Sequence, residues 1–343
     1  MVKKPTITDV ARRAGVSIAT VSFVLNNSPG QVISEPVKKK VMKAAKALNY
    51  HPSAIAAGLA SRRTGNIAIV FYRSPDLISN QYYSFVLEGA IREAARRGYN
   101  LFFSYVDAEY GAAEELPKVV REGNTDGVIF VKQVHPQMVR DIESRAIPVV
   151  VIDHFPRTSD VNAIEIDNFR GAEMAAEHLI ALGHRRIACL FACGDRPSIQ
   201  GRLDGYRHAM ELAGIPLHDR DSLVDCGDLG FEAGLESALH LLSRKRRPTA
   251  ILCVNDELAA GVLRAAHGAG LSVPSDLSVT GFDNITMSRF TDPPITTVSG
   301  DKEELGAHAI RRLVEIIARK SADKIQEVLP VSLIVRNSTA VAP

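Results

Sequence analysis

The first fifty residues carry apolar positions at helical spacing, and they predict three short helices. The first begins at a Thr6 cap, where Asp9 completes the pattern of a capping box, and it ends at Gly15. The second begins after Ser17 and turns three apolar residues inward: Val21, Val24 and Leu25. The third spans Ser34 to about Leu48, with an apolar inner stripe and five lysines on its outer face.

The outward face of the second helix combines apolar and hydroxyl side chains. It carries Ile18, Ala19, Ser22 and Phe23, with Thr20 at its border. Two short helices joined by a glycine turn, the second rich in hydroxyls, are typical of a helix-turn-helix that enters the major groove of DNA. An ordinary helical hairpin has the same caps and is the alternative interpretation.

After Gly65 the pattern changes to apolar strands that alternate with amphipathic helices. Strands are expected at Ile67–Phe71, Leu101–Tyr105, Gly127–Val131, Val149–Ile152, Ile187–Phe191, Ala250–Val254 and Leu277–Gly281. Helices are expected at Ser84–Arg97, Gly171–Leu182, Leu203–Ala213, Phe231–Leu242 and Leu258–Gly268. This alternation predicts parallel sheets covered by helices on both faces. Because the span is too long for one sheet, we expect an α/β body of two doubly wound parallel-sheet lobes.

Charge separates the first 65 residues from the rest of the chain. They hold eleven Lys and Arg against two acidic residues, a net charge of +9. The remaining residues hold 30 basic and 37 acidic side chains, a net charge of −7. This asymmetry indicates a small all-α head that binds a polyanion, followed by a mildly acidic body. A solvated basic tail is the alternative, but the helical periodicity argues against it.

Composition narrows the class of protein further. At 343 residues the chain has room for two or three domains. It shows neither an apolar run that would span a membrane nor an export signal, so a cytoplasmic protein is expected. The four cysteines lack metal-ligand spacing, and the motifs of phosphate loops, nucleophile elbows and zinc helices are missing. We therefore expect neither an enzyme nor a cofactor or metal site.

Polar side chains follow several of the predicted strands. Asp153, Asn255 and Asp283 stand at the carboxyl ends of three strands, and Arg202 begins the helix after a fourth. In open α/β sheets, ligands bind beyond these ends. Carboxylates, an amide and a guanidinium suit a polyhydroxylated ligand or one of mixed polarity. Each residue alone could equally be a helix cap, and Asp256 is interpreted mainly as a cap.

Three stretches resemble the LacI/GalR family of bacterial transcription regulators. They are TITDVARRAGVSIATVSFVLN, then LNYHPSAIAAGLASRRTGNIAIV after a lysine-rich helix, and SLIVRNST near the C-terminus. The resemblance implies a helix-turn-helix head at 1–51, a hinge helix and linker at 52–65, and an effector-binding and dimerisation body at 66–340. It also implies a periplasmic-binding-protein-like body whose chain crosses between lobes three times, with a last helix at about Lys302 to Arg319 that returns to the first lobe. The expected N-lobe is about 66–154 and 299–326, and the expected C-lobe is about 155–298 and 327–340.

The resemblance also assigns DNA contacts in the head and the hinge. It implies phosphate contacts from Ser17, Thr20, Ser22 and Asn26, and base contacts from Ile18, Ala19 and Phe23. Leu59 would wedge between base pairs in the minor groove, with Ala56 packed close by, and Tyr50 completes the expected set. The three base-facing side chains offer only apolar contacts, such as those to thymine methyl groups. Two heads related by a dyad would read a pseudo-palindromic operator.

In the body, the resemblance implies a small-molecule site between the lobes. Family positions favour Asp153, Arg202, Asn255 and Asp283 as contacts, with Tyr82, Tyr83, Arg196 and Ser198 as weaker candidates. Leu229 stands where some relatives place a stacking aromatic ring. The expected function is a dimeric repressor controlled by a sugar or sugar derivative. A nucleobase-like or protein co-regulator is the alternative, and a solute-binding receptor is a further one.

Overall fold

The computed structural model describes residues 5–25, 33–51, 63–72, 80–106, 116–132, 134–153, 161–194, 196–217, 222–319 and 324–343. The chain forms two compact units, Met1–Asn66 and Ile67–Pro343, which are called the head and the body from here on. The boundary between them lies one residue beyond Gly65, where the sequence pattern changes.

The head contains three described helices, α1 (Ile7–Ala14), α2 (Ile18–Leu25) and α3 (Glu35–Ala47), and these confirm the predicted ones. The capping box is complete, because Thr6 accepts from the Asp9 amide and the Asp9 carboxylate accepts from the Thr6 amide at 2.9 Å. Gly15 has φ 67°, the left-handed conformation that ends α1. The helices enclose a small apolar core of Val10, Ala11, Val21, Val41, Ala44 and Ala45.

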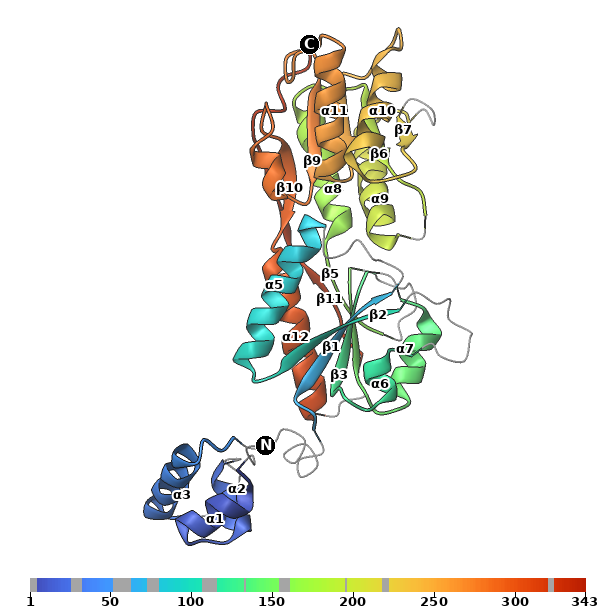
Figure 1. The fold of residues 1–343 in the computed structure, drawn as a ribbon. Helices are drawn as coiled ribbons and strands as arrows, with labels where there is room; N and C mark the ends of the chain where they lie inside the picture. Colours follow the sequence, from blue (N-terminus) through green and yellow to red (C-terminus); the bar gives the residue numbers. More distant parts are fainter. Residues whose placement is uncertain are drawn as a thin grey trace. The chain divides into compact units, whose positions relative to one another are not determined.

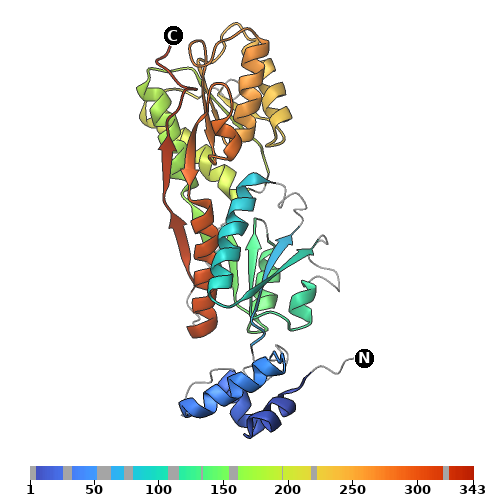
Figure 2. The same ribbon diagram turned by 60° about the vertical axis from the view of Figure 1, so that its left-hand side comes forward.

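The first lobe of the body is a six-stranded sheet in the order β11-β5-β4-β3-β1-β2 (Figure 1). Its strands are β1 (Asn66–Tyr72), β2 (Asn100–Val106), β3 (Gly127–Val131), β4 (Val149–Ile152), β5 (Asn162–Ile166) and β11 (Gln326–Leu329). One face is covered by α5 (Gln81–Arg96) and α12 (Lys302–Arg319), which pack together. The other face is covered by α6 (Lys118–Arg121) and α7 (Pro136–Glu143), as Figures 1 and 2 show.

The second lobe is also a six-stranded sheet, in the order β12-β10-β9-β8-β6-β7. Its strands are β6 (Ile187–Phe191), β7 (Leu223–Asp225), β8 (Ala250–Cys253), β9 (Ser278–Phe282), β10 (Thr296–Gly300) and β12 (Val331–Ile334). β12 runs antiparallel to β10, and the other pairs are parallel. Around the sheet, α8 (Asn168–Ala181) packs on α9 (Pro197–Leu212), and α10 (Phe231–Leu242) packs on α11 (Asp256–Gly268).

Three crossings join the lobes. The first predicted boundary, at about 154, is wrong because β5 belongs to the first lobe, whereas the other two agree with the structure to within a few residues. The chain leaves the first lobe after β5, returns after β10 and leaves again between β11 and β12. β5 belongs to the first lobe because it pairs in parallel with β4, with Val151 opposite Ala163, and β11 pairs with β5 in turn. Both strands are short and carry charged residues, so their hydrophobic pattern did not reveal which sheet would accept them.

The strands expected from the sequence are confirmed to within one residue at each end, but several elements were missed. The missed elements are α6, α7, β5, β7, β10, β11 and β12. Four body helices begin earlier than predicted. The reason is a polar cap that precedes the apolar stripe in three of them: Asn80 caps α5, Asp167 caps α8 and Asn255 caps α11. In the fourth, Pro197 occupies the first turn of α9.

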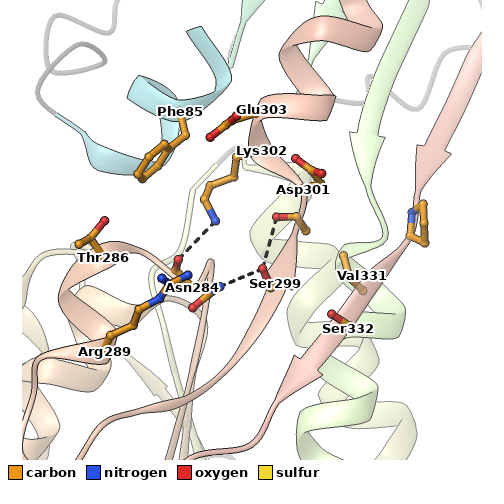
Figure 3. A pocket seen from close by; sticks show the side chains of 12 residues that line it. Phe85, Asn284, Thr286, Arg289, Ser299, Asp301, Lys302, Glu303, Val331 and Ser332 are labelled. Carbon is orange, nitrogen blue, oxygen red and sulfur yellow. Dashed lines mark hydrogen bonds between the residues drawn. The ribbon is translucent and has the colours of Figure 1, made fainter. Parts of the chain in front are cut away.

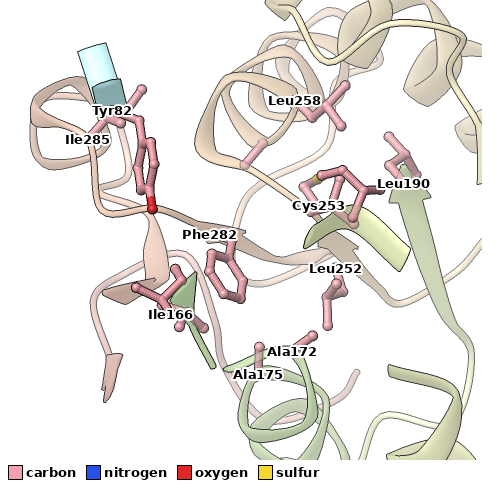
Figure 4. Packing of buried hydrophobic residues seen from close by; sticks show 14 of the residues in the cluster. Tyr82, Ile166, Ala172, Ala175, Leu190, Leu252, Cys253, Leu258, Phe282 and Ile285 are labelled. Atoms are coloured by element: carbon pink, nitrogen blue, oxygen red, sulfur yellow. The ribbon is translucent and has the colours of Figure 1, made fainter. Parts of the chain in front are cut away.

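Close helix packing holds the first lobe together. Gly306 on α12 faces α5, and a Cβ atom there would lie 1.8 Å from the Val86 carbonyl oxygen. In the second lobe, Phe282 packs over Gly171 of α8, beside Ala172 and Ala175 (Figure 4).

Cys189 and Cys253 lie buried within β6 and β8. Among the described helices, none has the length and apolar character needed to cross a lipid bilayer.

Candidate functional site

Two tyrosines and an aspartate form a buried polar group in the first lobe. Asn80 caps α5 by accepting from the amides of Tyr82 and Tyr83, which fixes both side chains in the first helical turn. The Tyr83 hydroxyl donates to Asp153 Oδ2 at 2.6 Å. Asp153 directly follows β4 and adopts φ 62°, a conformation that costs energy in a non-glycine residue. The rings of the two tyrosines meet edge to face at 5.0 Å.

Burial sets the proton affinity of this group. Removal from water raises the pKa of Asp153 to about 6, while the hydrogen bond from Tyr83 and the charges of Arg202 and Lys132 oppose the rise. The Lys132 ammonium lies 5.7 Å from the centre of the Tyr83 ring. Glu165, on β5, has its pKa raised to about 7 by burial and then by the charge of Asp153. The first lobe therefore holds carboxylates that are close to their titration point at neutral pH.

The second lobe contributes a buried arginine that is held on four sides. Arg202 on α9 donates from Nε to Asn168 Oδ1 at 2.8 Å and from Nη1 to the Val254 carbonyl at 2.5 Å. Its Nη2 lies 3.0 Å from Asp283 Oδ1, and its guanidinium lies 3.7 Å from the centre of the Phe282 ring. This packing fixes the guanidinium in one orientation, which is what a binding site for a rigid ligand requires.

The two groups lie close enough for their charges to act on each other across the lobes. Asp283 and Arg202 both shift the pKa of Tyr82, which burial raises first of all, and both act on Asp153. The Tyr82 hydroxyl and Asp153 Oδ1 are buried and make no hydrogen bond within the described residues. Buried polar atoms without partners are costly, so these two are open positions for a ligand that offers hydroxyl groups. The structure thus brings together the predicted Tyr82, Tyr83, Asp153, Arg202 and Asp283.

The cap of α11 is Asn255, and Asp256 has a different role in the core of the second lobe. Asn255 is the helix cap, because its Oδ1 accepts from the Leu258 amide at 2.9 Å and its amide group donates to the Leu229 carbonyl. Asp256 is fully buried and accepts from the Ile285 amide at 2.8 Å and from the Thr297 hydroxyl. Burial raises the pKa of Asp256 to about 7. The interpretation of Asp256 as a cap is therefore wrong.

Arg196 and Ser198 lie away from the contacts that join this cluster. Arg196 lines a separate cavity of about 270 Å³ at the end of β6, together with Gln200 and Arg207. Ser198 is half-buried in the first turn of α9. Within the described ranges, His, Cys, Asp and Glu side chains do not gather in any group of three that would hold a metal ion.

The outward face of α2 is the second candidate surface. Ser17, Ile18 and Ala19 are exposed, whereas Thr20, Ser22 and Phe23 are half-buried. Ser17 Oγ accepts from the Thr20 amide at 3.0 Å and lies 2.9 Å from the Thr20 hydroxyl, so both hydroxyls are positioned at the start of the helix. Tyr50 is half-buried and packs against the core of the head. The predicted contacts Asn26, Ala56 and Leu59 lie outside the described residues.

Three residues of the body site escaped the sequence analysis. Phe282 supports the guanidinium of Arg202, Lys132 lies beside Tyr83, and Glu165 adds a second titrating carboxylate. Phe282 and Lys132 had a usable signal, because both stand at the carboxyl end of a strand, as Asp153 and Asp283 do. Glu165 had none, since β5 itself was not predicted.

Comparisons with known proteins agree along nearly the whole chain. A family model described as "Bacterial regulatory proteins, lacI family" matches residues 6–53, and one described as "Periplasmic binding protein-like domain" matches residues 176–339. The HTH-type transcriptional regulator DegA of Bacillus subtilis (strain 168) is 37% identical over 341 residues, 98% of either chain. The ribose operon repressor of Escherichia coli (strain K12) is 35% identical over 316 residues, 92% of this chain and 93% of that protein. The crystal structure of the Lac repressor dimer bound to operator and the anti-inducer ONPF is 27% identical with a TM-score of 0.82, and the match covers 98% of this chain and 100% of that one.

Proposed function

The chain belongs to the lacI family of bacterial regulatory proteins, and we propose that it is a cytoplasmic repressor released from or held on its operator by an uncharged polyhydroxylated molecule. The observation that carries the proposal is the buried pair of polar groups in the body, Tyr83–Asp153 and Arg202–Asp283, joined to a head with a helix-turn-helix. Members of this family are DNA-binding transcription regulators that work as dimers, and they are not enzymes.

The head supports DNA binding through its shape and its charge. The exposed Ser17 lies at the start of α2, where the helix dipole favours a phosphate. Ser17, Thr20 and Ser22 would bind the backbone, and the apolar Ile18, Ala19 and Phe23 would contact base edges. The net charge of +9 on the first 65 residues favours association with any DNA, so the specific contacts have to come from these few side chains.

The chemistry of the body site favours a sugar-like effector over a nucleobase. Two carboxylates, a guanidinium and an unpaired tyrosine hydroxyl can exchange hydrogen bonds with a row of hydroxyl groups. A flat nucleobase would gain most from aromatic stacking, but Leu229 stands where some relatives place a ring, and the chain contains no Trp. The two carboxylates also disfavour an anionic ligand at this position.

Regulation follows from the division of the site between two lobes. An effector that bonds to Asp153 in the first lobe and Arg202 in the second stabilises one relative arrangement of the lobes. Allosteric coupling of this kind is typically about 1–3 kcal/mol, a change of about 5- to 150-fold in operator affinity.

Tyr82→Phe tests the effector site without disturbing the fold. The variant deletes only a hydroxyl that has no partner in the described residues, so stability should be equal or higher, while effector affinity falls about 2- to 12-fold for one lost hydrogen bond. The matched control is Tyr206→Phe, whose hydroxyl donates to the Ile187 carbonyl at 2.8 Å: stability should fall and effector affinity should not. Operator binding by fluorescence anisotropy, with sugars and nucleobases added in turn, provides the readout. A response to nucleobases alone, or to a protein partner alone, would contradict the proposal.

Ile18→Ala tests the head in the same way. Ile18 is 48% exposed and lies outside the core of the head, so its truncation should weaken specific operator binding and leave the thermal stability of the head unchanged. The control is Val21→Ala on the same helix, which is fully buried and should destabilise the head. If Ile18→Ala binds its selected operator as well as the unaltered protein does, the assignment of base contacts to this face is wrong.

We also propose that the edge of the first-lobe sheet forms the dimer surface. β2 is the last strand in that sheet and exposes Phe102, Phe103 and Tyr105, with Ile91 exposed on the neighbouring α5. An apolar edge strand invites pairing with a second chain. Phe102→Lys should convert the dimer to a monomer in sedimentation velocity, whereas Leu212→Lys, at a more exposed apolar site in the second lobe, should leave it dimeric. Unchanged sedimentation of Phe102→Lys would rule this edge out.

A further inference from the structure

A second cavity, of about 640 Å³, lies where the lobes of the body join (Figure 3). We call it the junction cavity. It is bordered by the start of α12, by η2 (Thr286–Arg289) and by the segments that lead out of β10 and into β12. None of the five residues that the effector site brings together lines it. Its size is that of a space for a small metabolite.

A buried ammonium group faces this cavity. Lys302 is 8% exposed, and its Nζ donates to the carbonyl oxygens of Asp283 at 2.6 Å and Asn284 at 3.4 Å. Within the described part of the chain, no carboxylate lies within ion-pair distance of it. Carbonyl dipoles offset only part of the cost of removing a full charge from water. Lys302 therefore makes no direct ion pair, although the carboxylates of Asp283, Asp256 and Asp301 are close enough to act on its charge.

A second cation borders the same space. Arg289 is exposed at the end of η2, and its guanidinium has neither a hydrogen bond nor an ion pair among the described residues. Two acidic residues also line this space: Glu303 pairs with Arg92, whereas Asp301 accepts from the Glu304 amide at 2.9 Å and makes no ion pair among the described residues. The amino terminus of the 18-residue α12 adds a favourable dipole for an anion.

Neutral polar groups complete the lining. The Asn284 amide donates to Ser299 Oγ at 3.1 Å, and its Oδ1 accepts from Arg336. Thr286 and Ser332 add hydroxyl groups from other elements. Two cations that make no direct ion pair suit the double charge of a phosphate better than the single charge of a carboxylate. We propose that the junction cavity binds a small phosphomonoester of a polyol, with its phosphate between Lys302 and Arg289.

The junction cavity and the effector site are connected through one turn of the chain, at Asp283 and Asn284. Asp283 and Asn284 both have left-handed backbones, with φ 97° and 47°. The Asp283 carboxylate faces Arg202, while its carbonyl is held by Lys302. An anion that draws Lys302 toward the cavity acts on the same turn that positions the Asp283 carboxylate.

The test is titration calorimetry of the full chain with glycerol 3-phosphate in a buffer free of phosphate. Saturable binding is expected, weakened about tenfold or more by Arg289→Ala, because a hydrogen-bonded charge contact is lost. Among the described residues, Arg289 makes neither a hydrogen bond nor an ion pair, so this variant should unfold at the same temperature as the unaltered chain. The matched control is Arg246→Ala, another exposed arginine in the loop before β8.

Equal affinity of Arg246→Ala and the unaltered chain, with loss in Arg289→Ala, supports the junction cavity. Three results would overturn it: no saturable binding, equal weakening by both arginine variants, or loss of binding in Tyr82→Phe. The last result would move the phosphate into the effector site. The inference goes beyond the proposed function, and since the assay uses neither operator nor sugar, its failure would leave that function standing.

Discussion

The ion pair between Arg202 and Asp283 should be worth far more than its surface counterparts, and a double-mutant cycle can measure the difference. Arg202→Met keeps the volume of the side chain but strands the Asp283 carboxylate, Asn168 Oδ1 and the Val254 carbonyl. Removing one partner of a buried pair costs about 3–5 kcal/mol. Asp283→Asn leaves Arg202 its other two hydrogen bonds, so it should cost about 1.5–3 kcal/mol.

The double variant lacks both charges, so no buried charge remains without its partner. Its cost should therefore fall short of the sum of the single costs by about 2 kcal/mol. The assay is urea unfolding followed by circular dichroism at pH 7.5, at one fixed protein concentration because dimerisation shifts apparent stability. An unchanged dependence on urea concentration would show that the unfolded states are comparable.

The same helix offers a matched control. Arg207 and Asp204 on α9 lie 3.2 Å apart with each side chain 41% exposed, and their coupling should stay below about 0.5 kcal/mol. A coupling between Arg202 and Asp283 no larger than that of this surface pair would show that burial does not strengthen the interaction.

Three other predictions concern packing, protonation and capping. Gly306→Ala should destabilise the body by several kcal/mol, because its Cβ would meet the Val86 carbonyl at 1.8 Å and force α5 away; an unchanged melting temperature would contradict the packing. Asp256 keeps its proton in the folded state up to a pKa of about 7, whereas the unfolded chain releases it near 3.8, so its contribution to stability falls as pH rises between these values. The free energy of unfolding of Asp256→Asn, measured with urea, should therefore rise relative to that of the unaltered chain by up to about 4 kcal/mol between pH 4 and 8. A difference that stays constant with pH would refute this. Thr6→Ala should lower the stability of the head by about 1 kcal/mol in thermal unfolding, since it removes the hydroxyl that accepts from the Asp9 amide and caps α1. No loss of stability would argue against the capping box.

Local patterns in the sequence were enough for the head and for most of the body. Helix caps, glycine turns and periodicity act between residues a few positions apart, so the three head helices and all predicted strands were found. The polar residues at strand ends were found for the same reason: a parallel sheet gathers its carboxyl ends at one edge. Of the residues found in this way, Asp153, Arg202 and Asp283 meet in one cluster, and the family resemblance supplied Tyr82 and Tyr83 of the same cluster.

The tertiary structure decided what depends on contacts between distant segments. β5 belongs to the first lobe because it pairs with β4, and β11 belongs to it because it pairs with β5. The sequence of so short a strand does not show which sheet it will join. Asn255 caps the helix, whereas Asp256 is buried and accepts hydrogen bonds from Ile285 and Thr297. These two residues lie far along the chain, so only the folded structure brings them to Asp256. The junction cavity arose where two crossings meet beside η2. Periodicity says which side chains turn inward, but only the packed fold determines what they meet there.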